Sequence, residues 1–552
     1  MPVISGKKQQ GKGMKKVAII GTGPTGIYTL LSLIRHHPPC SVTIFEQTAE
    51  AGVGMPYRRE ASSPVMLANI ASIEIPPVMT TYIAWLRAQC PERLAGFGIT
   101  ASALHERQFL PRILLGDYFR QQFLQLVDQA ESQGFILHVH TSCQVTDILA
   151  LPEGIKVTAQ GRPVAEWVDF AVIATGHVWP AENTRRHTFF PSPWSGLMKA
   201  SVPACRVGIL GTSLSAIDAA MAVVTQHGHF CENGVQGPQF ILRDSSRSLQ
   251  IVLMSRSGVL PEADFYCPIP YQPLQLVTPE AIAALVAGGS AGLLDRAFRL
   301  MVQEITLADP LWSRQTGLEH LNADNFCDAW FAARRRQDPF SYARKNLQDT
   351  RLNTLTKYTV PWRYVILRLH EAIAGIVPHL SPEDSVRFRS GLARVFIDNY
   401  AAIPPQSLRR LLALHDAGIL TILPLGQDYR ARKYSNKTVI FAGETQHIYD
   451  IFIDARGQKP LKTRDLPFPG LRKQMLNSGG EIPQVAGNYL LLEPASARGH
   501  IAFGALPYLM HDRPFIQGLT VSAEIGETIA NAILHSAPGA AELQPGPEEG
   551  HV

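Results

Sequence analysis

Three closely spaced glycines near the start of the chain could hold a phosphate group. The segment 17–26, VAIIGTGPTG, leads from a β-branched run into Gly21, Gly23 and Gly26, and an apolar helical pattern follows over residues 27–34. In a strand–turn–helix unit the first glycine permits a tight turn, the second lets a pyrophosphate approach the backbone, and the third lets the helix pack on the strand. Free N–H groups and the positive dipole end of the helix would then bind the phosphates.

A carboxylate follows at the separation that this kind of unit requires. Residues 42–45, VTIF, form a second predicted strand, and Glu46 comes directly after it, twenty residues beyond Gly26. An acid at this place accepts hydrogen bonds from the ribose hydroxyls of a dinucleotide. The glycines alone are weak evidence, but together with Glu46 they predict a bound dinucleotide instead of a glycine-rich turn without a ligand.

A second segment repeats the first with changes. Residues 207–220, VGILGTSLSAIDAA, keep Gly211 but carry Ser213 and Ala216 in place of the second and third glycines. Ala216 is a mild replacement, whereas the Cβ of Ser213 occupies space beside the expected pyrophosphate. The hydroxyl groups of Ser213 and Ser215 could still donate hydrogen bonds to phosphate oxygens.

The strand after this second turn ends in residues that could select a cofactor. The predicted strand 251–254 is followed by Ser255 and Arg256, at the places that Glu46 and Gln47 take in the first copy. A carboxylate would repel a 2′-phosphate, whereas a serine and an arginine would bind one. These residues favour NADPH over NADH. The alternative is a vestigial unit, retained for packing, in which Arg256 is only solvated.

Two α/β units and a helical segment would position these residues. VDFAVIATGH (168–177) and YDIFIDARGQ (449–458) are similar buried strands that end in Ala-x-Gly, so the chain contains two similar, doubly wound, Rossmann-like units. Apolar residues between 266 and 406 recur at helical spacing. The expected parts are a disordered extension (1–13), a dinucleotide unit (14–195 and 459–535), a second unit (196–265 and 407–458), a helical insertion (266–406) and a disordered tail (536–552).

Composition narrows the class of protein. The chain has 552 residues, 46% hydrophobic and 18% charged, which is ordinary for a folded protein with a large core. Seven well-separated cysteines without a CxxC pair argue against a disulfide framework or a metal site and fit a reducing cytoplasm. The sequence contains no run of 18 apolar residues, so it predicts no transmembrane segment. A net charge of +5 over this length does not indicate nucleic-acid binding, and nothing indicates the oligomeric state.

The motifs together resemble a known family. Besides the two turns, the segments MLANIASIEIPP (66–77), RQFLPRILLGDYF (107–119) and ATGH (174–177) are similar to segments of the bacterial FAD-NAD(P)-binding family, a largely uncharacterised relative of the ornithine and lysine N-hydroxylases and flavin monooxygenases. The resemblance implies a flavoprotein of the type with two dinucleotide-binding domains. It implies an FAD site formed by Gly21, Gly23, Pro24, Thr25, Gly26, Glu46, Asn69, Arg112, Val145, Thr175, Gly176, Gly504, Gly518, Leu519 and Thr520, and an NADPH site formed by Gly211, Thr212, Ser213, Ser215, Ser255 and Arg256.

The resemblance favours an FAD-dependent, NADPH-using oxidoreductase that acts on a small molecule. Within this class it favours a hydroxylating monooxygenase. No residue is identified as a catalytic acid, base or nucleophile. The substrate is expected between the flavin and the helical insertion, where Tyr266, Trp362, Arg363 and Tyr364 are candidate contacts or, alternatively, core residues. Two other functions stay open: a flavin-dependent dehydrogenase or reductase without oxygen insertion, and a non-catalytic flavin protein that senses redox state or serves as a scaffold.

Overall fold

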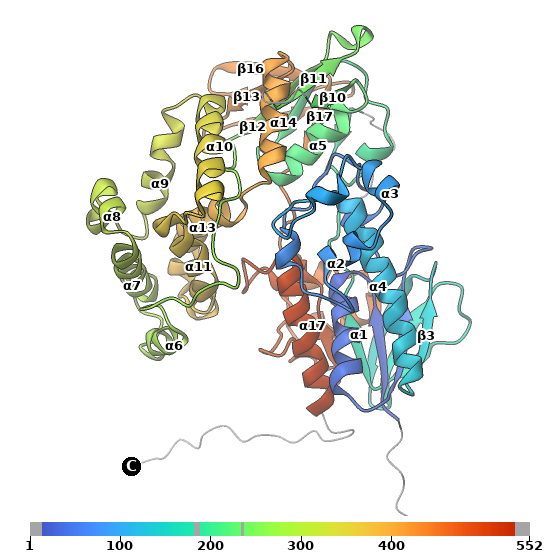
Figure 1. The fold of residues 1–552 in the computed structure, drawn as a ribbon. Coiled ribbons are helices and arrows are strands. Elements are labelled where there is room, and N and C mark those ends of the chain that lie inside the picture. The colour runs from blue at the N-terminus through green and yellow to red at the C-terminus, as the bar shows by residue number, and fades with distance from the viewer. Residues whose placement is uncertain (1–13, 181–187, 233–236, 536–552) are drawn as a thin grey trace, which may run out of the picture.

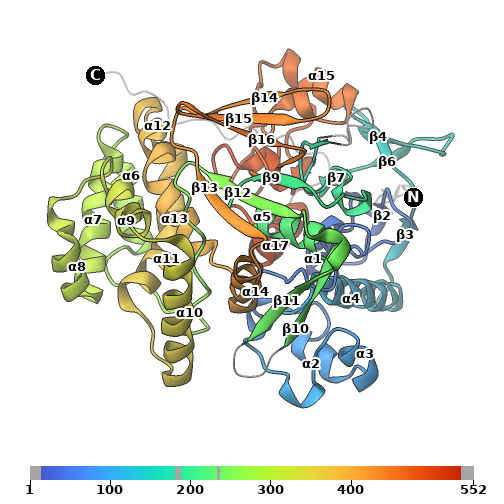
Figure 2. The same cartoon turned by 90° about the horizontal axis from the view of Figure 1, so that it is seen from above.

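The computed structural model describes residues 14–180, 188–232 and 237–535. Figure 1 shows two α/β units, one above the other, with a helical body beside them, and Figure 2 shows the same arrangement from above. The segments 1–13 and 536–552, for which the sequence predicts disorder, lie outside the described residues. Within the described ranges, no helix has both the length and the apolar composition needed to cross a membrane.

The first unit is built on a five-stranded parallel sheet in the order β18-β7-β1-β2-β3. Its strands are β1 (Lys16–Ile20), β2 (Ser41–Phe45), β3 (Ile136–His140), β7 (Phe170–Ile173) and β18 (Ile501–Phe503). β1, β2 and β7 are apolar and almost fully buried, as expected for a parallel sheet covered by helices. As the sequence predicts, the chain returns to this unit near its end, where β18 pairs with β7.

Three long helices pack beside one another on this unit: α1 (Pro24–His36), α4 (Arg112–Ser132) and α17 (Gly518–His535). α1 and α17 approach closely because Gly526 has no side chain, and a Cβ there would lie 2.6 Å from the backbone nitrogen of Thr29. This contact places the start of α17 near the start of α1. Shorter helices are α2 (Tyr82–Arg87), α3 (Pro91–Ala95), α15 (Pro469–Asn477) and α16 (Leu506–Leu509).

The second unit has the sheet order β13-β12-β9-β17-β8, in which four strands repeat the topology of the first unit and the edge strand β8 comes first in the chain instead of last. Its elements are β8 (Phe189–Phe190), β9 (Arg206–Leu210), α5 (Leu214–Val224), β12 (Gln250–Ser255), α14 (Pro405–Asp416), β13 (Leu420–Pro424) and β17 (Ile451–Asp454). β8 belongs to the stretch 14–195 that we expected in the first unit, but it pairs in parallel with β17 of the second. A strand of two residues has too little pattern to be recognised in the sequence.

Each unit also carries a small antiparallel sheet, which lies in the chain between β3 and β7 in the first unit and between β13 and β17 in the second. In the first unit this sheet consists of β4 (Val145–Leu151), β5 (Gly154–Ala159) and β6 (Glu166–Val168), and in the second of β14 (Arg430–Lys433), β15 (Thr438–Ala442) and β16 (Thr445–Tyr449). The second unit has in addition the hairpin of β10 (Gly228–Glu232) and β11 (Pro238–Leu242). The duplication therefore extends beyond the two glycine turns.

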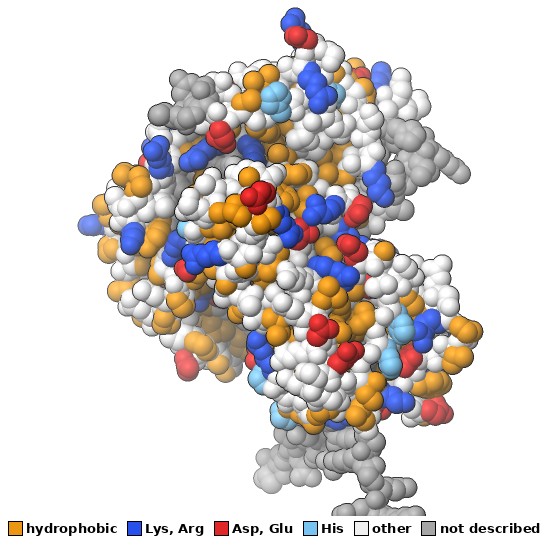
Figure 3. Space-filling view, turned by 45° about the vertical axis from the view of Figure 1, so that its right-hand side comes forward, with side chains coloured by type: hydrophobic (Ala, Val, Ile, Leu, Met, Phe, Trp, Pro, Cys, Tyr) orange, Lys and Arg blue, Asp and Glu red, His pale blue; other side chains and the backbone are white. Residues whose placement is uncertain are grey.

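The predicted helical insertion forms a body with a hydrophobic core of its own. Its helices are α6 (Pro279–Ala287), α7 (Leu293–Ala308), α8 (Pro310–Thr316), α9 (Phe326–Arg335), α10 (Pro339–Thr356), α11 (Pro361–Ala374), α12 (Pro382–Ser390) and α13 (Leu392–Tyr400). Phe515, which precedes α17, joins this core and so links the body to the first unit. On the face drawn in Figure 3, basic, acidic and apolar side chains are interspersed.

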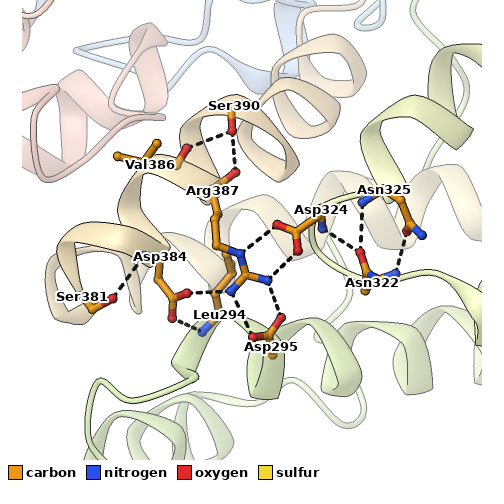
Figure 4. A network of polar contacts seen from close by, with 10 residues as sticks. All are labelled: Leu294, Asp295, Asn322, Asp324, Asn325, Ser381, Asp384, Val386, Arg387 and Ser390. Atoms are coloured by element: carbon orange, nitrogen blue, oxygen red, sulfur yellow. Dashed lines mark hydrogen bonds and ion pairs between the residues drawn. The ribbon is translucent and has the colours of Figure 1, made fainter.

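A single arginine ties α12 to other parts of the helical body (Figure 4). Arg387 donates hydrogen bonds to Asp295 at 2.8 Å, to Asp324 at 2.8 Å and to Asp384 at 2.7 Å. Hydrogen bonds from this guanidinium lower the pKa of Asp295 and of Asp324, so both carboxylates stay ionised at neutral pH. The network fixes α12 against the start of α7 and the loop before α9.

Candidate functional site

The two glycine turns lie at the carboxyl ends of the parallel strands, and the first of them opens into a cavity of about 420 Å³. This cavity runs from the end of β2 to the start of α17. Ends of parallel strands and starts of helices are where α/β folds bind nucleotides. Ten of the residues expected at an FAD site line it: Gly21, Gly23, Pro24, Thr25, Glu46, Val145, Thr175, Gly176, Gly518 and Leu519.

The three glycines of the first turn have different reasons to be glycine. Gly21 has a φ of +103°, and a Cβ there would lie 2.4 Å from the carbonyl oxygen of Ala174. A Cβ on Gly26 would lie 2.2 Å from the carbonyl oxygen of Gly21. Gly23, by contrast, has an ordinary φ of −73°, and the atom nearest to its ideal Cβ is the Cα of Gly54 at 3.7 Å. Neither backbone conformation nor packing requires Gly23, so its missing side chain leaves room for a molecule in the cavity.

Glu46 is held as an ionised carboxylate at the edge of this cavity. Its Oε2 accepts hydrogen bonds from the hydroxyl of Thr22 at 2.6 Å and from the N–H of Thr22 at 3.3 Å. Its Oε1 accepts from the hydroxyl of Thr48 at 2.8 Å, from the N–H of Thr48 at 2.9 Å and from Arg58 at 2.9 Å. Burial raises the pKa of Glu46, but these hydrogen bonds and the charge of Arg58 outweigh burial, and the net shift is downward.

Three polar side-chain atoms at the end of β7 fit a bound polar molecule. Thr175 Oγ1, His177 Nδ1 and Trp179 Nε1 belong to residues that line the cavity, and all three atoms are buried without a hydrogen-bond partner within the described residues. A buried polar atom without a partner is costly, so such atoms commonly mark a ligand site. Burial lowers the pKa of His177, which is therefore neutral at neutral pH. The residues present fit FAD as the implied cofactor.

Five of the expected FAD residues do not line this cavity. Gly26 lies beneath the turn, Gly504 makes room for the side chain of Thr25, and Thr520 is exposed on the first turn of α17. Asn69 lines a different cavity. Arg112 makes its contacts elsewhere in the first unit and with the second unit.

Arg112 connects the two units. Its Nη1 forms an ion pair with Oδ2 of Asp218 at 2.6 Å, and its Nε donates a hydrogen bond to the carbonyl oxygen of Leu67 at 3.0 Å. Arg112 begins α4 of the first unit, and Asp218 lies in α5 of the second. Both side chains are largely buried. The sequence motif marked an important residue, but its partner is a carboxylate on the opposite unit.

Several lining residues were missed by the sequence analysis. Arg58 and Trp179 gave no local signal, and His177, although it ends the ATGH segment, was not named as a site residue, because nothing in the sequence indicates which way these side chains point. Gly54 could have been found, since Gly52 and Gly54 form a second close pair of glycines, both with positive φ. A Cβ on Gly54 would lie 3.3 Å from the Cα of Gly23, so this loop closes over the turn.

The second turn shows what its altered residues do. Gly211 has a φ of +139°, and a Cβ there would lie 2.9 Å from the carbonyl oxygen of Ala455. Ser213 caps α5 in an extended conformation, exposed, and its hydroxyl makes no capping hydrogen bond. Ala216 is fully buried behind the turn. Ser213 is therefore accommodated without strain, and its exposed hydroxyl makes no hydrogen bond to the first turn of α5.

Strand register places Ser255 at the position of Glu46. Met254 pairs with Leu210 as Phe45 pairs with Ile20, so the next residue is Ser255 in one unit and Glu46 in the other. The hydroxyl of Thr212 donates to Ser255 Oγ at 3.3 Å, and the N–H of Gly258 donates to the same atom at 3.1 Å. Both contacts use Ser255 as acceptor, which leaves its hydroxyl proton free. The adjacent Arg256 is exposed.

The residues named as possible substrate contacts separate into two groups. Tyr266 lines a second cavity, of about 500 Å³, between the first unit and the helical body. Trp362 stacks on Trp312 with ring centroids 4.7 Å apart, and Arg363 forms a buried ion pair with Glu262 at 3.1 Å. Tyr364 is buried and does not line the cavity. These three residues have packing roles.

Comparison with known proteins agrees with this geometry. Residues 18–178 match the family model described as FAD-NAD(P)-binding, and residues 278–400 match that of the YdhS-like middle domain. The uncharacterised protein YdhS of Escherichia coli (strain K12) is 58% identical over 524 residues, which cover 95% of this chain and 98% of that protein.

Solved structures with low sequence identity share the fold. An ornithine N-hydroxylase from Kutzneria sp. 744 matches with a TM-score of 0.50 and 13% identity, covering 94% of this chain and 99% of that one. An ornithine hydroxylase from Pseudomonas aeruginosa matches with a TM-score of 0.50 and 11% identity, covering 95% and 99%. The architecture is that of flavoproteins with two dinucleotide-binding domains. The chain therefore belongs, together with YdhS, to the FAD-NAD(P)-binding family, whose cofactors are FAD and a nicotinamide nucleotide.

Proposed function

We propose that the protein is an FAD-dependent, NADPH-using oxidoreductase that acts on a small molecule. The observation that supports this most directly is Gly23, a glycine that neither backbone conformation nor packing requires and that faces the cavity. In this proposal the FAD pyrophosphate lies against Gly23, Pro24 and Thr25 at the start of α1. Val145 contacts the adenine, and the start of α17 at Gly518 faces the pyrimidine edge of the flavin.

Glu46 would bind the adenosine ribose. The carboxylate already accepts five hydrogen bonds, and its two oxygens offer about four lone-pair sites. A ribose hydroxyl must therefore replace one of these donors. We expect it to replace Arg58, because the contacts of Thr22 and Thr48 include backbone N–H groups fixed by the turn. The released guanidinium would stay in the cavity, where it can neutralise phosphate charge.

The second unit would bind NADPH. Ser213 and Ser215 would donate hydrogen bonds to the pyrophosphate, and Ser255 and Arg256 would bind the 2′-phosphate. The exposed hydroxyl of Ser213, the hydroxyl of Ser255 and the exposed guanidinium of Arg256 support this assignment. When bound, FAD would supply the redox chemistry between the nicotinamide nucleotide and an electron acceptor.

Within this class we favour a hydroxylating monooxygenase, because both of the solved structures compared above are named hydroxylases. A hydroxylase must exclude water from its reduced cofactor until substrate is present. The helical body, which lies beside both units, could provide this cover. The other candidate is a dehydrogenase or reductase that does not insert oxygen.

One series of measurements tests these proposals in order. The purified full chain, reconstituted with FAD, should be yellow and hold about one FAD per chain. NADPH should bleach it in the absence of oxygen, more readily than NADH does. After rapid mixing with oxygen, a transient absorbance that differs from both the reduced and the oxidised spectra would support hydroxylation. Direct reoxidation with full release of hydrogen peroxide would favour the reductase, and failure of NADPH to bleach the flavin would favour a non-catalytic flavin protein.

A further inference from the structure

A second cavity lies apart from the FAD cavity and is lined by three parts of the chain. It has a volume of about 500 Å³ and shares no lining residue with the FAD cavity. Its walls come from the segment around Asn69 and Glu74 in the first unit, from residues 264–271, and from the helical body together with the start of α14. A small molecule of substrate size fits such a volume.

Two arginines lie where this cavity meets another one. Arg351 of α10 and Arg409 of α14 line the 500 Å³ cavity and also an adjoining cavity of about 600 Å³. Both are exposed, and within the described residues neither guanidinium has an ion-pair or hydrogen-bond partner. Neighbouring arginines differ, since Arg344 pairs with Asp416 and Arg410 donates to the carbonyl oxygen of Val65. Two unpaired guanidinium groups beside one cavity favour an anionic group between them.

The inner wall of the cavity offers acceptors. Asn399 is 3% exposed, and its Nδ2 donates to the carbonyl oxygen of Arg363 at 3.2 Å. Its Oδ1 is buried and has no hydrogen-bond partner in the part of the chain that the structure describes. The carboxyl groups of Glu74 and Asp264 line the same cavity. Burial, and then the charge of Glu74, raise the pKa of Asp264 to about 7. The side chain of Arg107 stacks on Tyr266 at 4.6 Å and partly offsets these carboxyl groups.

We propose that this cavity binds a small molecule with two different ends. An anionic group, a carboxylate or a phosphate, lies between Arg351 and Arg409, and a hydrogen-bond donor such as an ammonium group meets Asn399, Glu74 and Asp264. The helical body would thus supply residues that select the ligand. That such a molecule binds is independent of flavin chemistry, whereas its being the substrate rests on the proposed function.

Calorimetric titration of the FAD-reconstituted full chain tests this proposal with four probes. O-phosphoethanolamine and γ-aminobutyrate carry both groups, inorganic phosphate carries only the anion, and putrescine carries only ammonium groups. We expect the probes with both groups to bind more tightly than either single-group probe. Comparison of O-phosphoethanolamine with γ-aminobutyrate distinguishes the two anions. The tighter-binding probe of these two should carry the same anionic group, phosphate or carboxylate, as the natural ligand.

Substitutions then locate the two ends. Arg351→Gln combined with Arg409→Gln should weaken binding of O-phosphoethanolamine and γ-aminobutyrate about 10- to 100-fold, while Arg389→Gln, at an exposed arginine of α12 outside both cavities, should change nothing. Asn399→Leu should weaken the aminated probes but not inorganic phosphate. Retained binding of phosphate by that variant would show that the cavity is still folded.

Two results would overturn the proposal: no anionic probe binds to the natural chain, or the double arginine variant binds the anionic probes as well as the natural chain does. FAD content and bleaching by NADPH, measured on the same preparations, report separately on the proposed function. A chain that binds these probes but cannot be loaded with FAD would refute only the flavin assignment.

Discussion

In the first unit β7, β1, β2 and β3 lie side by side, and in the second unit β17, β9, β12 and β13 repeat this order. A three-stranded antiparallel sheet is inserted at the same place in each. One individual hydrogen bond is repeated as well. The turn threonine bonds to the residue at the same register position of the neighbouring strand: Thr22 to Glu46 in one unit and Thr212 to Ser255 in the other.

The units differ where a nucleotide would touch them. The first has a glycine facing its cavity and a carboxylate held by five hydrogen bonds, whereas the second has Ser213 and the neutral Ser255 followed by Arg256. The framework that both units share positions the residues at each turn. The residues that differ between the units change the charge and the space beside the turn. One duplicated scaffold thus carries two turns that differ in charge and in space, and the proposed function assigns the first to FAD and the second to NADPH.

The largest expected effect comes from Gly23→Val. A branched side chain would fill the space of the pyrophosphate, and overpacking of about 1–3 kcal/mol together with lost phosphate hydrogen bonds should abolish bound FAD. The control is Ser213→Val at the equivalent position of the second unit, which should keep its FAD. Flavin absorbance per chain after reconstitution measures both. Equal FAD content in the two variants would mean that the glycine turn does not hold the cofactor.

Breaking the ion pair between the units should come next. Arg112→Ala leaves Asp218 buried without its partner, which should lower the free energy of unfolding by about 3–5 kcal/mol. Arg59→Ala removes a partly exposed pair with Asp117, which keeps Arg93 as a second partner, and should cost no more than about 1 kcal/mol. Chemical denaturation of the two variants tests this. Loss of FAD without loss of stability in the Arg112 variant would instead identify Arg112 as a cofactor contact.

A smaller effect is expected from Arg256→Ala. Removing a charged hydrogen bond to the 2′-phosphate should reduce the preference for NADPH over NADH by on the order of tenfold, at the low end for such bonds because Arg256 is exposed. The rate of anaerobic bleaching at a series of nucleotide concentrations measures the preference. Arg247→Ala, at an exposed arginine in the loop before β12, is the control. If the natural chain uses both nucleotides equally, Arg256 does not select between them.

The smallest effect concerns pH. Because the pKa of Glu46 lies below its ordinary value of 4.5 in the folded chain, its contribution to stability is complete above that value and is lost as the pH falls through the lower, folded pKa. The stability difference between the natural chain and Glu46→Gln should therefore stay constant from pH 7 to about pH 5 and shrink below. Ser255→Ala, at the matching position, should give a difference that does not change with pH over this range.

The sequence predicted those parts of the fold that rest on local patterns. Three patterns are local in the sequence: the β-branched run before Gly21, the glycine spacing and the apolar helical repeats. They predicted the two turns and the helical body. The partner of Arg112 and the strand β8 depend on segments far apart in the chain. For the same reason only Tyr266 among the residues that line the cavity between Asn399, Glu74 and Arg409 was named as a candidate substrate contact, because no short stretch contains the walls of this cavity.

The late position of β18 and α17 has a consequence for biosynthesis. The first unit begins the chain, but its sheet gains β18 and the cavity proposed for FAD gains Gly518 and Leu519 only after the second unit and the helical body have been synthesised. Because α17 also packs closely on α1, a nascent chain that stops before Gly518 lacks one wall of the cavity. Flavin uptake on the ribosome should thus be delayed until α17 has emerged, which makes cofactor insertion a late event in the maturation of this protein.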